Sequence, residues 1–275
     1  MDAREMVDKQ YGVDSLLQKI ENGLKQTGKD LNFLKVDDLI PVDEFHTRGR
    51  KATLEMAEMV NLKSSDRVLD VGCGLGGTAR YLAEGYKCHV IGVDLSDEYI
   101  MVGRKLTELV KLSDRVDLQQ ASALQLPFED GVFDVVWTQH VQMNISDKNR
   151  FYTEIARVLK SGGRLLFHDV FHNSGDKPVY PVPWADDESM SILLTENEAH
   201  AIIEDAGMKI NQWIGKLEES AAFFDRVVSR IEAKGHAPLG IHLLLGVTAE
   251  DKLRNYAQNL REKRLTVVVG MAEKQ

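Results

Sequence analysis

Short runs of β-branched and other apolar residues alternate with amphipathic segments from residue 67 onward. The runs lie at 68–71, 90–93, 116–118, 133–137 and 164–167. Between several of them, as at 96–110 and 151–159, apolar residues recur every three or four positions, the spacing of one helix face. Strands that alternate with helices predict an α/β fold with a doubly wound, mostly parallel sheet covered by helices on both faces.

The two ends of the chain depart from this alternation. Residues 1–60 have helical and turn-rich patterns, which predict an N-terminal helical lid ahead of a main domain at 61–275. One helix is expected to follow the stretch 48–50, with Leu54 and Ala57 facing inward. Residues 215–262 carry two further helical patterns before a last apolar run at 265–271. We therefore expect a seven-stranded, Rossmann-like sheet with a helical cap inserted before the last strand.

The stretch LDVGCGLGGTARYL joins the first predicted strand to a helix. Gly72, Gly74 and Gly77 satisfy G-x-G-x-x-G, and Gly76 completes the shorter spacing G-x-G-x-G. Glycine is needed where the backbone turns tightly and a ligand lies against it. Asp94 ends the second predicted strand, where an acid accepts hydrogen bonds from ribose hydroxyls. The pattern predicts a site for an adenosine-containing cofactor.

Asp70 narrows the choice of cofactor. Its carboxylate lies two residues before the first glycine, and it would repel a pyrophosphate at a poorly screened site. S-adenosylmethionine carries an ammonium and a sulfonium and has no phosphate. This charge argument favours S-adenosylmethionine over a nicotinamide dinucleotide. A NAD-dependent oxidoreductase and a non-catalytic cofactor-binding module remain the alternatives from other functional classes.

Four motifs in order resemble those of class I S-adenosylmethionine-dependent methyltransferases. They are DVGCGLG at 70–76, the acid at 94, ASALQLPF at 121–128 and FDVVWTQH at 133–140. The resemblance covers residues 67 to about 170, and Ser122 stands where the family usually has an acid beside the adenine. The cofactor-binding residues that the resemblance implies are Asp70, Gly72, Cys73, Gly74, Gly76, Asp94, Leu95, Ser122, Ala123, Leu124 and Gln139.

Two segments outside these motifs are similar to bacterial small-molecule methyltransferases of the sarcosine/dimethylglycine N-methyltransferase kind. They are DEFHTRG at 43–49 and KRLTVVV at 263–269. This narrower resemblance implies N-methylation of a glycine- or sarcosine-like amine, with S-adenosylhomocysteine as the cofactor product. O- or S-methylation of a small metabolite is the alternative. The identity of the acceptor and the number of methyl transfers stay open.

His140 is the candidate catalytic residue, because it directly follows the fourth predicted strand and can accept a proton near neutral pH. It acts either as a base or by positioning the acceptor. His46 is the second candidate, as a lid residue near the reacting groups or as a surface residue of a turn. Arg48 and Arg50 either bind a carboxylate or begin an exposed helix. The residues expected to line the acceptor site are Phe45, Gln142, Met143, Asn144 and Trp184.

The amino-acid composition indicates which binding partners and which cellular location to expect. The 275-residue chain has a formal net charge of −9, which argues against nucleic acid or an anionic membrane as a partner. Two cysteines exclude a disulfide framework, and His168 and His172 straddle a strand end without the spacing of a metal site, so no metal is expected. The polar start, Met1–Glu5, does not resemble a signal peptide. We expect a cytoplasmic enzyme acting on a small molecule, in an oligomeric state that the sequence does not indicate.

Overall fold

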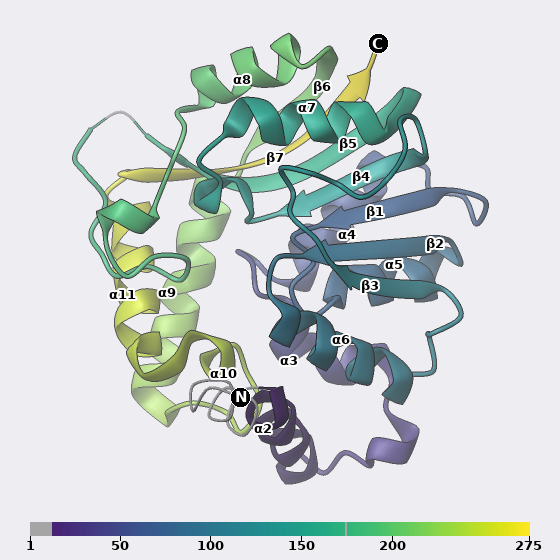
Figure 1. The fold of residues 1–275 in the computed structure, drawn as a ribbon. Helices are drawn as coiled ribbons and strands as arrows, with labels where there is room; N and C mark the ends of the chain where they lie inside the picture. The colour runs from purple at the N-terminus through teal and green to yellow at the C-terminus, as the bar shows by residue number, and fades with distance from the viewer. Residues whose placement is uncertain (1–12, 174) are drawn as a thin grey trace, which may run out of the picture.

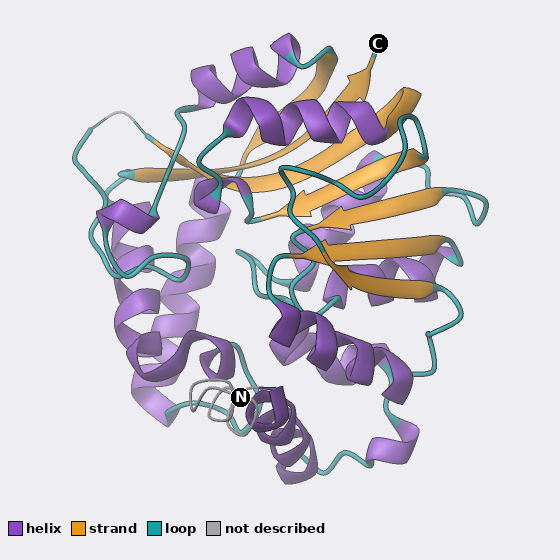
Figure 2. Ribbon diagram, in the orientation of Figure 1, coloured by secondary structure: helices purple, strands orange, loops and turns teal. Residues whose placement is uncertain are grey.

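A computed structural model describes residues 13–173 and 175–275, with the side chains described from Leu16 on. The first residues of the expected lid, including the polar start Met1–Glu5, lie outside the described residues. In the described part, seven strands form one sheet in the order β3-β2-β1-β4-β5-β7-β6 (Figures 1 and 2). The strands are β1 (Arg67–Val71), β2 (His89–Asp94), β3 (Val116–Gln120), β4 (Phe133–Gln139), β5 (Leu159–His172), β6 (Met208–Gly215) and β7 (Leu265–Lys274).

The sheet is parallel except at β7, which runs antiparallel to both β5 and β6. Central strands such as β1 are buried on both faces: Val68, Leu69 and Val71 are fully buried. For this reason their sequences are continuous apolar runs and do not alternate between apolar and polar residues. The order of strands reverses between β1 and β4, and open α/β sheets bind ligands at such a point. The predicted doubly wound, mostly parallel sheet is confirmed.

Helices cover both faces of the sheet (Figure 1). On one face lie α4 (Arg50–Met59), α5 (Gly77–Tyr86) and α6 (Asp97–Leu109), and on the other lie α7 (Lys148–Val158) and α8 (Glu196–Asp205). Ser96 caps α6 by accepting a hydrogen bond from the Tyr99 backbone. The prediction that Leu54 faces inward is wrong, because Leu54 is 43% exposed whereas Met56 and Ala57 fill the buried face of α4.

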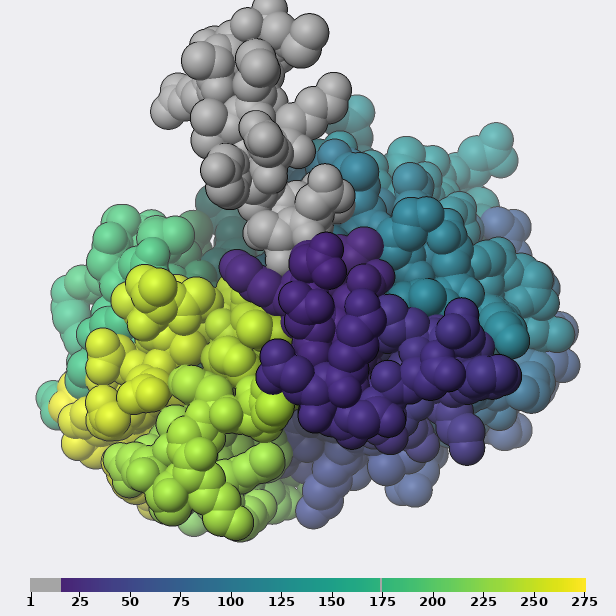
Figure 3. Space-filling model, turned by 90° about the horizontal axis from the view of Figure 1, so that it is seen from below, coloured from purple at the N-terminus to yellow at the C-terminus, as the bar shows by residue number. Residues whose placement is uncertain are grey.

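The N-terminal elements are α2 (Val13–Gln26), η1 (Leu31–Phe33), η2 (Val36–Leu39) and α3 (Ile40–Asp43). Ile20 and Leu24 of α2 are fully buried against a cluster that includes Leu106 of α6 and Leu239. Figure 3 shows α2, in purple, between the cap in yellow and green and the blue-teal part of the molecule. The lid is also tied to the sheet, because Arg80 of α5 forms a fully buried ion pair with Asp43 at 2.5 Å.

The predicted cap is confirmed as an insertion between β6 and β7. It consists of α9 (Leu217–Lys234), α10 (His242–Leu245), η5 (Gly246–Thr248) and α11 (Ala249–Arg261). Phe224 of α9 and Tyr256 of α11 pack in one cluster with Val170 of β5 and Val267 of β7, which fixes the cap beside the carboxyl end of β5. Two short 3-10 helices, η3 (Gln142–Asn144) and η4 (Glu188–Met190), follow β4 and β5. None of the helices described combines the length and the apolar character needed to cross a membrane.

Candidate active site

The glycine turn between β1 and α5 is held against β2. The backbone N–H groups of Gly72 and Cys73 both donate to the carbonyl of Val93, at 2.8 and 3.0 Å. Gly72, Gly74 and Gly76 all have positive φ angles, of 72°, 53° and 80°, which glycine adopts without the strain of a side chain. The predicted tight turn is therefore present at the carboxyl edge of the sheet.

The three glycines are needed for different reasons. A Cβ at Gly72 would lie 2.2 Å from a methyl group of Val141, and one at Gly76 would lie 2.7 Å from a methyl group of Leu118. A Cβ at Gly74 would meet nothing within 4 Å. Protein atoms thus exclude a side chain at Gly72 and Gly76, whereas the space beside Gly74 is open to a ligand.

That open space belongs to a cavity of about 410 Å³, which we call the turn cavity. It extends from the glycine turn past the end of β2 to the loop at 121–124. Of the eleven predicted cofactor-binding residues, those that line it are Asp70, Gly72, Cys73, Gly74, Asp94, Leu95, Ser122, Ala123, Leu124 and Gln139. Gly76 does not line it, because its α-carbon faces Leu118 and Arg80 instead.

Two carboxylates of the turn cavity differ in their surroundings. Asp94 accepts hydrogen bonds from the backbone N–H groups of Gly74 and Ser96, both at 2.9 Å. Asp70 is 3% exposed, and its Oδ2 has no hydrogen-bond partner among the described residues. Burial, and then the negative charge of Asp94, raise the pKa of Asp70 to about 7, against a hydrogen bond from the Ala79 backbone that lowers it. A cation bound beside the unpartnered Oδ2 would stabilise the charged form.

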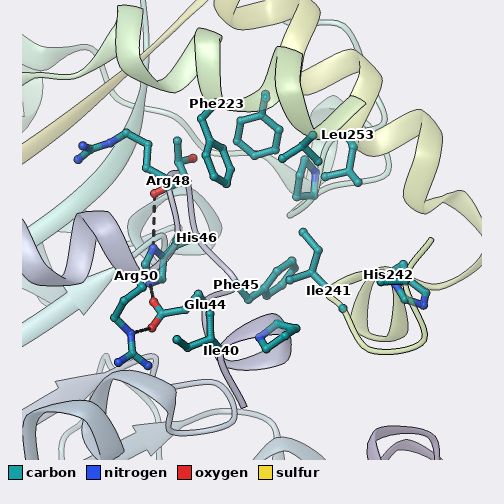
Figure 4. A pocket seen from close by; sticks show the side chains of 18 of the residues that line it. Ile40, Glu44, Phe45, His46, Arg48, Arg50, Phe223, Ile241, His242 and Leu253 are labelled. Carbon is teal, nitrogen blue, oxygen red and sulfur yellow. Dashed lines mark hydrogen bonds and ion pairs between the residues drawn. The ribbon is translucent and has the colours of Figure 1, made fainter. Parts of the chain in front are cut away.

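A second cavity, of about 890 Å³, lies between the lid and the cap, and we call it the cap cavity (Figure 4). Four residues line both cavities: Phe45, His46, His140 and Asn144. The turn cavity and the cap cavity therefore meet at a boundary that contains both predicted catalytic histidines.

His140 begins the loop after β4, with a φ of 56°. Its Nε2 accepts a hydrogen bond from the backbone N–H of Thr47 at 3.3 Å, which requires an unprotonated Nε2. Burial, followed by the nearby His46 and Arg48, holds the pKa of His140 well below its usual value of 6.5. His140 is thus neutral at neutral pH, with its proton on Nδ1.

His46 and His168 complete a cluster of three imidazole rings. Ring centroids are 4.8 Å apart for His140 and His168, 5.7 Å for His46 and His168, and 6.3 Å for His46 and His140. Both ring nitrogens of His168 are buried without a hydrogen-bond partner in the described structure. Across residues 13–173 and 175–275, no group of three or more histidines, cysteines and carboxylates is arranged to hold a metal ion.

Glu44 holds His46 in place. His46 Nε2 lies 2.8 Å from Glu44 Oε2, and Glu44 also pairs with Arg50 and accepts a hydrogen bond from Thr53 at 3.0 Å (Figure 4). Burial alone would raise the pKa of Glu44, but the hydrogen bonds and charges of His46 and Arg50 lower it to about 2. Glu44 is therefore an anion whose partners are already supplied by the lid.

Gln139 reaches the same cluster through its side chain. Its Oε1 accepts hydrogen bonds from Thr78 at 2.9 Å and from Trp137 at 2.8 Å, and these two donors orient the amide. Its Nε2 then lies 3.2 Å from His46 Nε2. The sequence analysis lists Gln139 as a cofactor-binding residue, and its side-chain contact with His46 depends on Thr78 and Trp137, which were not among the predicted site residues.

The predicted acceptor residues divide into two groups. Phe45, Met143, Asn144 and Trp184 line the cap cavity, as expected. Gln142 does not: it is fully buried and donates to the carbonyl of Val170 at 2.9 Å, because the turn of η3 directs it toward β5. One face of α9 also lines this cavity, and none of its residues was among the predicted acceptor residues. The helical pattern within 215–262 predicts the helix, but not which of its residues face the acceptor. The α9 residues in the cavity wall are Phe223, Phe224, Val227 and Ile231.

Arg48 and Arg50 are occupied within the protein. Arg50 pairs with Glu44, and Arg48 donates to Glu55 at 2.7 Å. The remaining N–H groups of the two arginines, Nε and Nη2 of Arg48 and Nη2 of Arg50, are buried and have no hydrogen-bond partner among the described residues. Both arginines line the cap cavity, so the expectation that they bind a ligand carboxylate stays a prediction.

Comparisons with known proteins agree with this geometry. A family described as a methyltransferase domain matches residues 69–167. The chain is 36% identical over 129 residues, 47% of its length, to a glycine/sarcosine/dimethylglycine N-methyltransferase of Actinopolyspora halophila. It is 36% identical over 122 residues, 43% of its length, to a chloroplastic tocopherol O-methyltransferase of Arabidopsis thaliana. The matched regions cover only 23% and 35% of these two relatives.

Solved structures match over more of the chain at lower identity. The [4+2]-cyclase SpnF aligns with a TM-score of 0.72 and 22% identity, over 98% of this chain and 94% of that one. A geranyl diphosphate methyltransferase in complex with S-adenosylmethionine aligns with a TM-score of 0.67 and 18% identity, over 82% of this chain and 85% of that one. At these identities the likeness establishes the fold.

Proposed function

We propose that this chain, which belongs to the class I S-adenosylmethionine-dependent methyltransferases, transfers a methyl group to a small molecule bound in the cap cavity. The observation that carries the proposal is the common boundary of the turn cavity and the cap cavity at His46 and His140. In-line transfer requires donor and acceptor to be aligned at close range, and such orientation supplies about 7–11 kcal/mol of the barrier. We further propose that the residues up to 60 act as the lid of this site and 215–262 as its cap.

The residues of the turn cavity fit S-adenosylmethionine. Its ammonium would satisfy the unpartnered Oδ2 of Asp70, and the space left by the absent Cβ of Gly74 lets a ligand approach the backbone. Asp94 is oriented by two backbone N–H groups and keeps lone pairs for ribose hydroxyls. When bound, the cofactor supplies an electrophilic methyl group on a sulfonium. A pyrophosphate would instead meet two carboxylates, which opposes the dinucleotide alternative.

The position of His140 at the boundary of the two cavities, with an unprotonated Nε2, supports its role as the group that receives the acceptor's proton. The Thr47 N–H occupies this lone pair in the structure, so base catalysis by His140 requires the segment around Thr47 to move aside. His46, fixed by Glu44 and adjacent to Gln139, then positions the acceptor from the lid side. The contacts of these side chains at the boundary support both roles.

The finer proposal concerns the acceptor atom. N-methylation of a glycine- or sarcosine-like amine is supported by the name of the Actinopolyspora relative, and O-methylation by the name of the Arabidopsis relative. The net charge of −9 argues against nucleic acid as the methyl acceptor. The matched regions span about a quarter to a third of the length of these relatives. Their names therefore do not decide whether the acceptor atom here is nitrogen or oxygen. The residues that line the cap cavity are the remaining source of information.

The proposal is tested by methyl transfer from S-adenosylmethionine carrying a labelled methyl group. Glycine, sarcosine, phenols, aliphatic alcohols and thiols serve as the acceptor panel. We expect label in at least one product and its loss in His140→Gln. Failure of the wild-type chain to bind S-adenosylhomocysteine, together with no transfer to any member, would refute the proposed function.

A further inference from the structure

We infer that the acceptor is a large, mostly apolar and uncharged molecule with a hydroxyl group, rather than a small zwitterion such as sarcosine. This inference rests on the proposed function, because it assigns the cap cavity to the acceptor. It is carried by three features of that cavity: its size, the chemistry of its wall and the protonation state of the histidine at its inner end.

The size of the cap cavity exceeds what a small amino acid fills. Its volume of about 890 Å³ lies in the upper part of the ~300–1,000 Å³ range of cavities that enclose drug-sized ligands. Sarcosine has only a few non-hydrogen atoms, so most of the cavity would remain filled with water around it. A ligand of larger size would contact the lid and the cap at the same time.

The wall of the cap cavity is aromatic and aliphatic over most of its length. Side chains of the lid and of the cap contribute to it (Figure 4), and the loop after β5 adds Pro183 and Trp184. The apolar side chains of the wall include Phe45, Trp184, Phe223, Val227, Ile231 and Ile241. Phe223, Val227 and Ile231 repeat at the spacing of one helix face, so α9 presents a continuous apolar stripe to the cavity. Burial of apolar ligand surface against such a wall is favourable by the hydrophobic effect.

The inner part of the described cavity wall has no free carboxylate for the ammonium of a zwitterion. Glu44, the carboxylate nearest the histidines, is paired with His46 and Arg50. The other charged lining residues include Lys29, Lys51 and Arg230, which are exposed and carry positive charge. An ammonium moved into this wall would lose hydration without gaining an anionic partner, which is costly.

The inner end of the cavity holds a hydrogen-bond acceptor to which a hydroxyl group of the ligand can donate. This acceptor is His140 Nε2, which can receive the proton of the hydroxyl once Thr47 releases it. In the reaction the hydroxyl oxygen forms a bond to the methyl carbon as the carbon–sulfur bond breaks. The electron pair of that bond leaves with sulfur, and the hydroxyl proton goes to Nε2. Atoms and charge balance without any further reactant.

Calorimetric titration of the chain saturated with S-adenosylhomocysteine tests the inference. The probes are para-alkylphenols with side chains from methyl to hexyl, and sarcosine. We expect affinity to rise about fourfold for each added methylene group, the value for burial of one CH₂, with sarcosine the weakest ligand. Equal affinities along the series, or sarcosine binding more tightly than hexylphenol, would overturn the inference. Binding of S-adenosylhomocysteine is measured first on the same sample. This measurement tests the proposed function independently of the size and chemistry of the acceptor.

A matched pair of substitutions locates the binding site. Val227→Asp puts a charge in the wall of the cap cavity, and Val247→Asp makes the same change at a fully exposed position of η5. We expect Val227→Asp to weaken hexylphenol binding roughly tenfold or more and Val247→Asp to leave it unchanged. The near-isosteric Val227→Thr should act in the same direction by a smaller factor. Retained affinity in both Val227 variants, with S-adenosylhomocysteine still bound, would contradict the assignment.

Discussion

His140 Nε2 accepts the backbone N–H of Thr47 at 3.3 Å, across 93 residues of chain. The bond joins the loop after β4 to the lid at the boundary between the turn cavity and the cap cavity. The lone pair that the proposed proton transfer requires is thus occupied by a backbone N–H of the segment at residues 44–49. Binding of the acceptor and release of Thr47 are therefore expected to be one event.

Replacement of His140 by glutamine should lower kcat by about 10²–10⁴-fold, because a positioned base contributes that much to proton transfer. Affinity for S-adenosylhomocysteine should change little, since the contacts of the turn cavity stay intact. Steady-state kinetics with the acceptor found in the panel measures the first quantity, and calorimetry measures the second. His89→Gln, at an exposed position at the start of β2, is the matched control. A kcat of His140→Gln equal to that of the control would exclude His140 from catalysis.

His140 should remain neutral well below pH 6.5 in the free protein, because burial and the neighbouring His46 and Arg48 disfavour its charged form. Its proton should lie on Nδ1, since Nε2 accepts from Thr47. Two-dimensional NMR of ¹⁵N-labelled imidazole rings, recorded over a pH series, measures both properties. Protonation of His140 near its usual pKa, or a proton on Nε2 in the neutral ring, would show that the contact with Thr47 does not form.

The buried carboxyl of Asp70 should make the free protein less stable as pH rises. Its pKa is raised from 3.8 to about 7, so between these values the folded chain holds a proton that the unfolded chain has released. The free energy of unfolding therefore falls as pH rises through this window, and the contribution is fully lost above it. Asp70→Asn removes this titration.

Denaturant unfolding of the wild type and Asp70→Asn at about pH 5 and about pH 8 isolates the effect of Asp70 from those of other buried acids. We expect the stability of the wild type relative to the variant to drop by about 1–3 kcal/mol over this interval, the cost of an unpaired buried polar group. Affinity of the variant for S-adenosylhomocysteine should fall, because the ligand's ammonium loses its partner. Parallel pH dependence of the two proteins would show that the folded protein does not raise the pKa of Asp70.

The glycine turn allows two substitutions of the same kind to be compared. Gly74→Ala adds a methyl group to open space in the turn cavity, whereas Gly72→Ala puts one 2.2 Å from Val141. Both variants carry the cost of a left-handed alanine, about 1–2 kcal/mol. Gly72→Ala should lose a further ~1–3 kcal/mol of unfolding free energy through overpacking. Gly74→Ala should instead show the more selective loss of S-adenosylhomocysteine affinity. Equal destabilisation of the two variants would contradict this division.

Much of the fold and of the turn cavity could be predicted because their signals are local. The run at 68–71, the glycines that follow and Asp94 all lie at fixed offsets within one strand–turn–helix unit. Residues at these offsets in the sequence also lie close together in the structure. Gly76 shows the limit of this logic, since it fits the motif but serves the packing of Leu118 and Arg80.

The cap cavity could be predicted only in part, because its wall is built from segments far apart in the chain. Gln142 follows His140 by two residues, yet η3 turns it into the core, whereas Phe223 lies far along the chain and faces the cavity. Arg48 and Arg50 resembled carboxylate ligands, but Glu55 and Glu44 already pair with them. Which partner a charged side chain finds depends on tertiary contacts that no local pattern records.

Binding of S-adenosylmethionine or its product at the glycine turn is tested by calorimetric titration of S-adenosylhomocysteine into the wild type, Asp94→Ala and Asp117→Ala. Asp117 is an exposed acid of β3 outside the turn cavity, so it controls for the loss of a charge. We predict one site per chain, an affinity weakened about tenfold or more in Asp94→Ala because ribose hydrogen bonds to a charged group are lost, and no change in Asp117→Ala. Tight binding of NAD by the wild type, without binding of S-adenosylhomocysteine, would contradict the account.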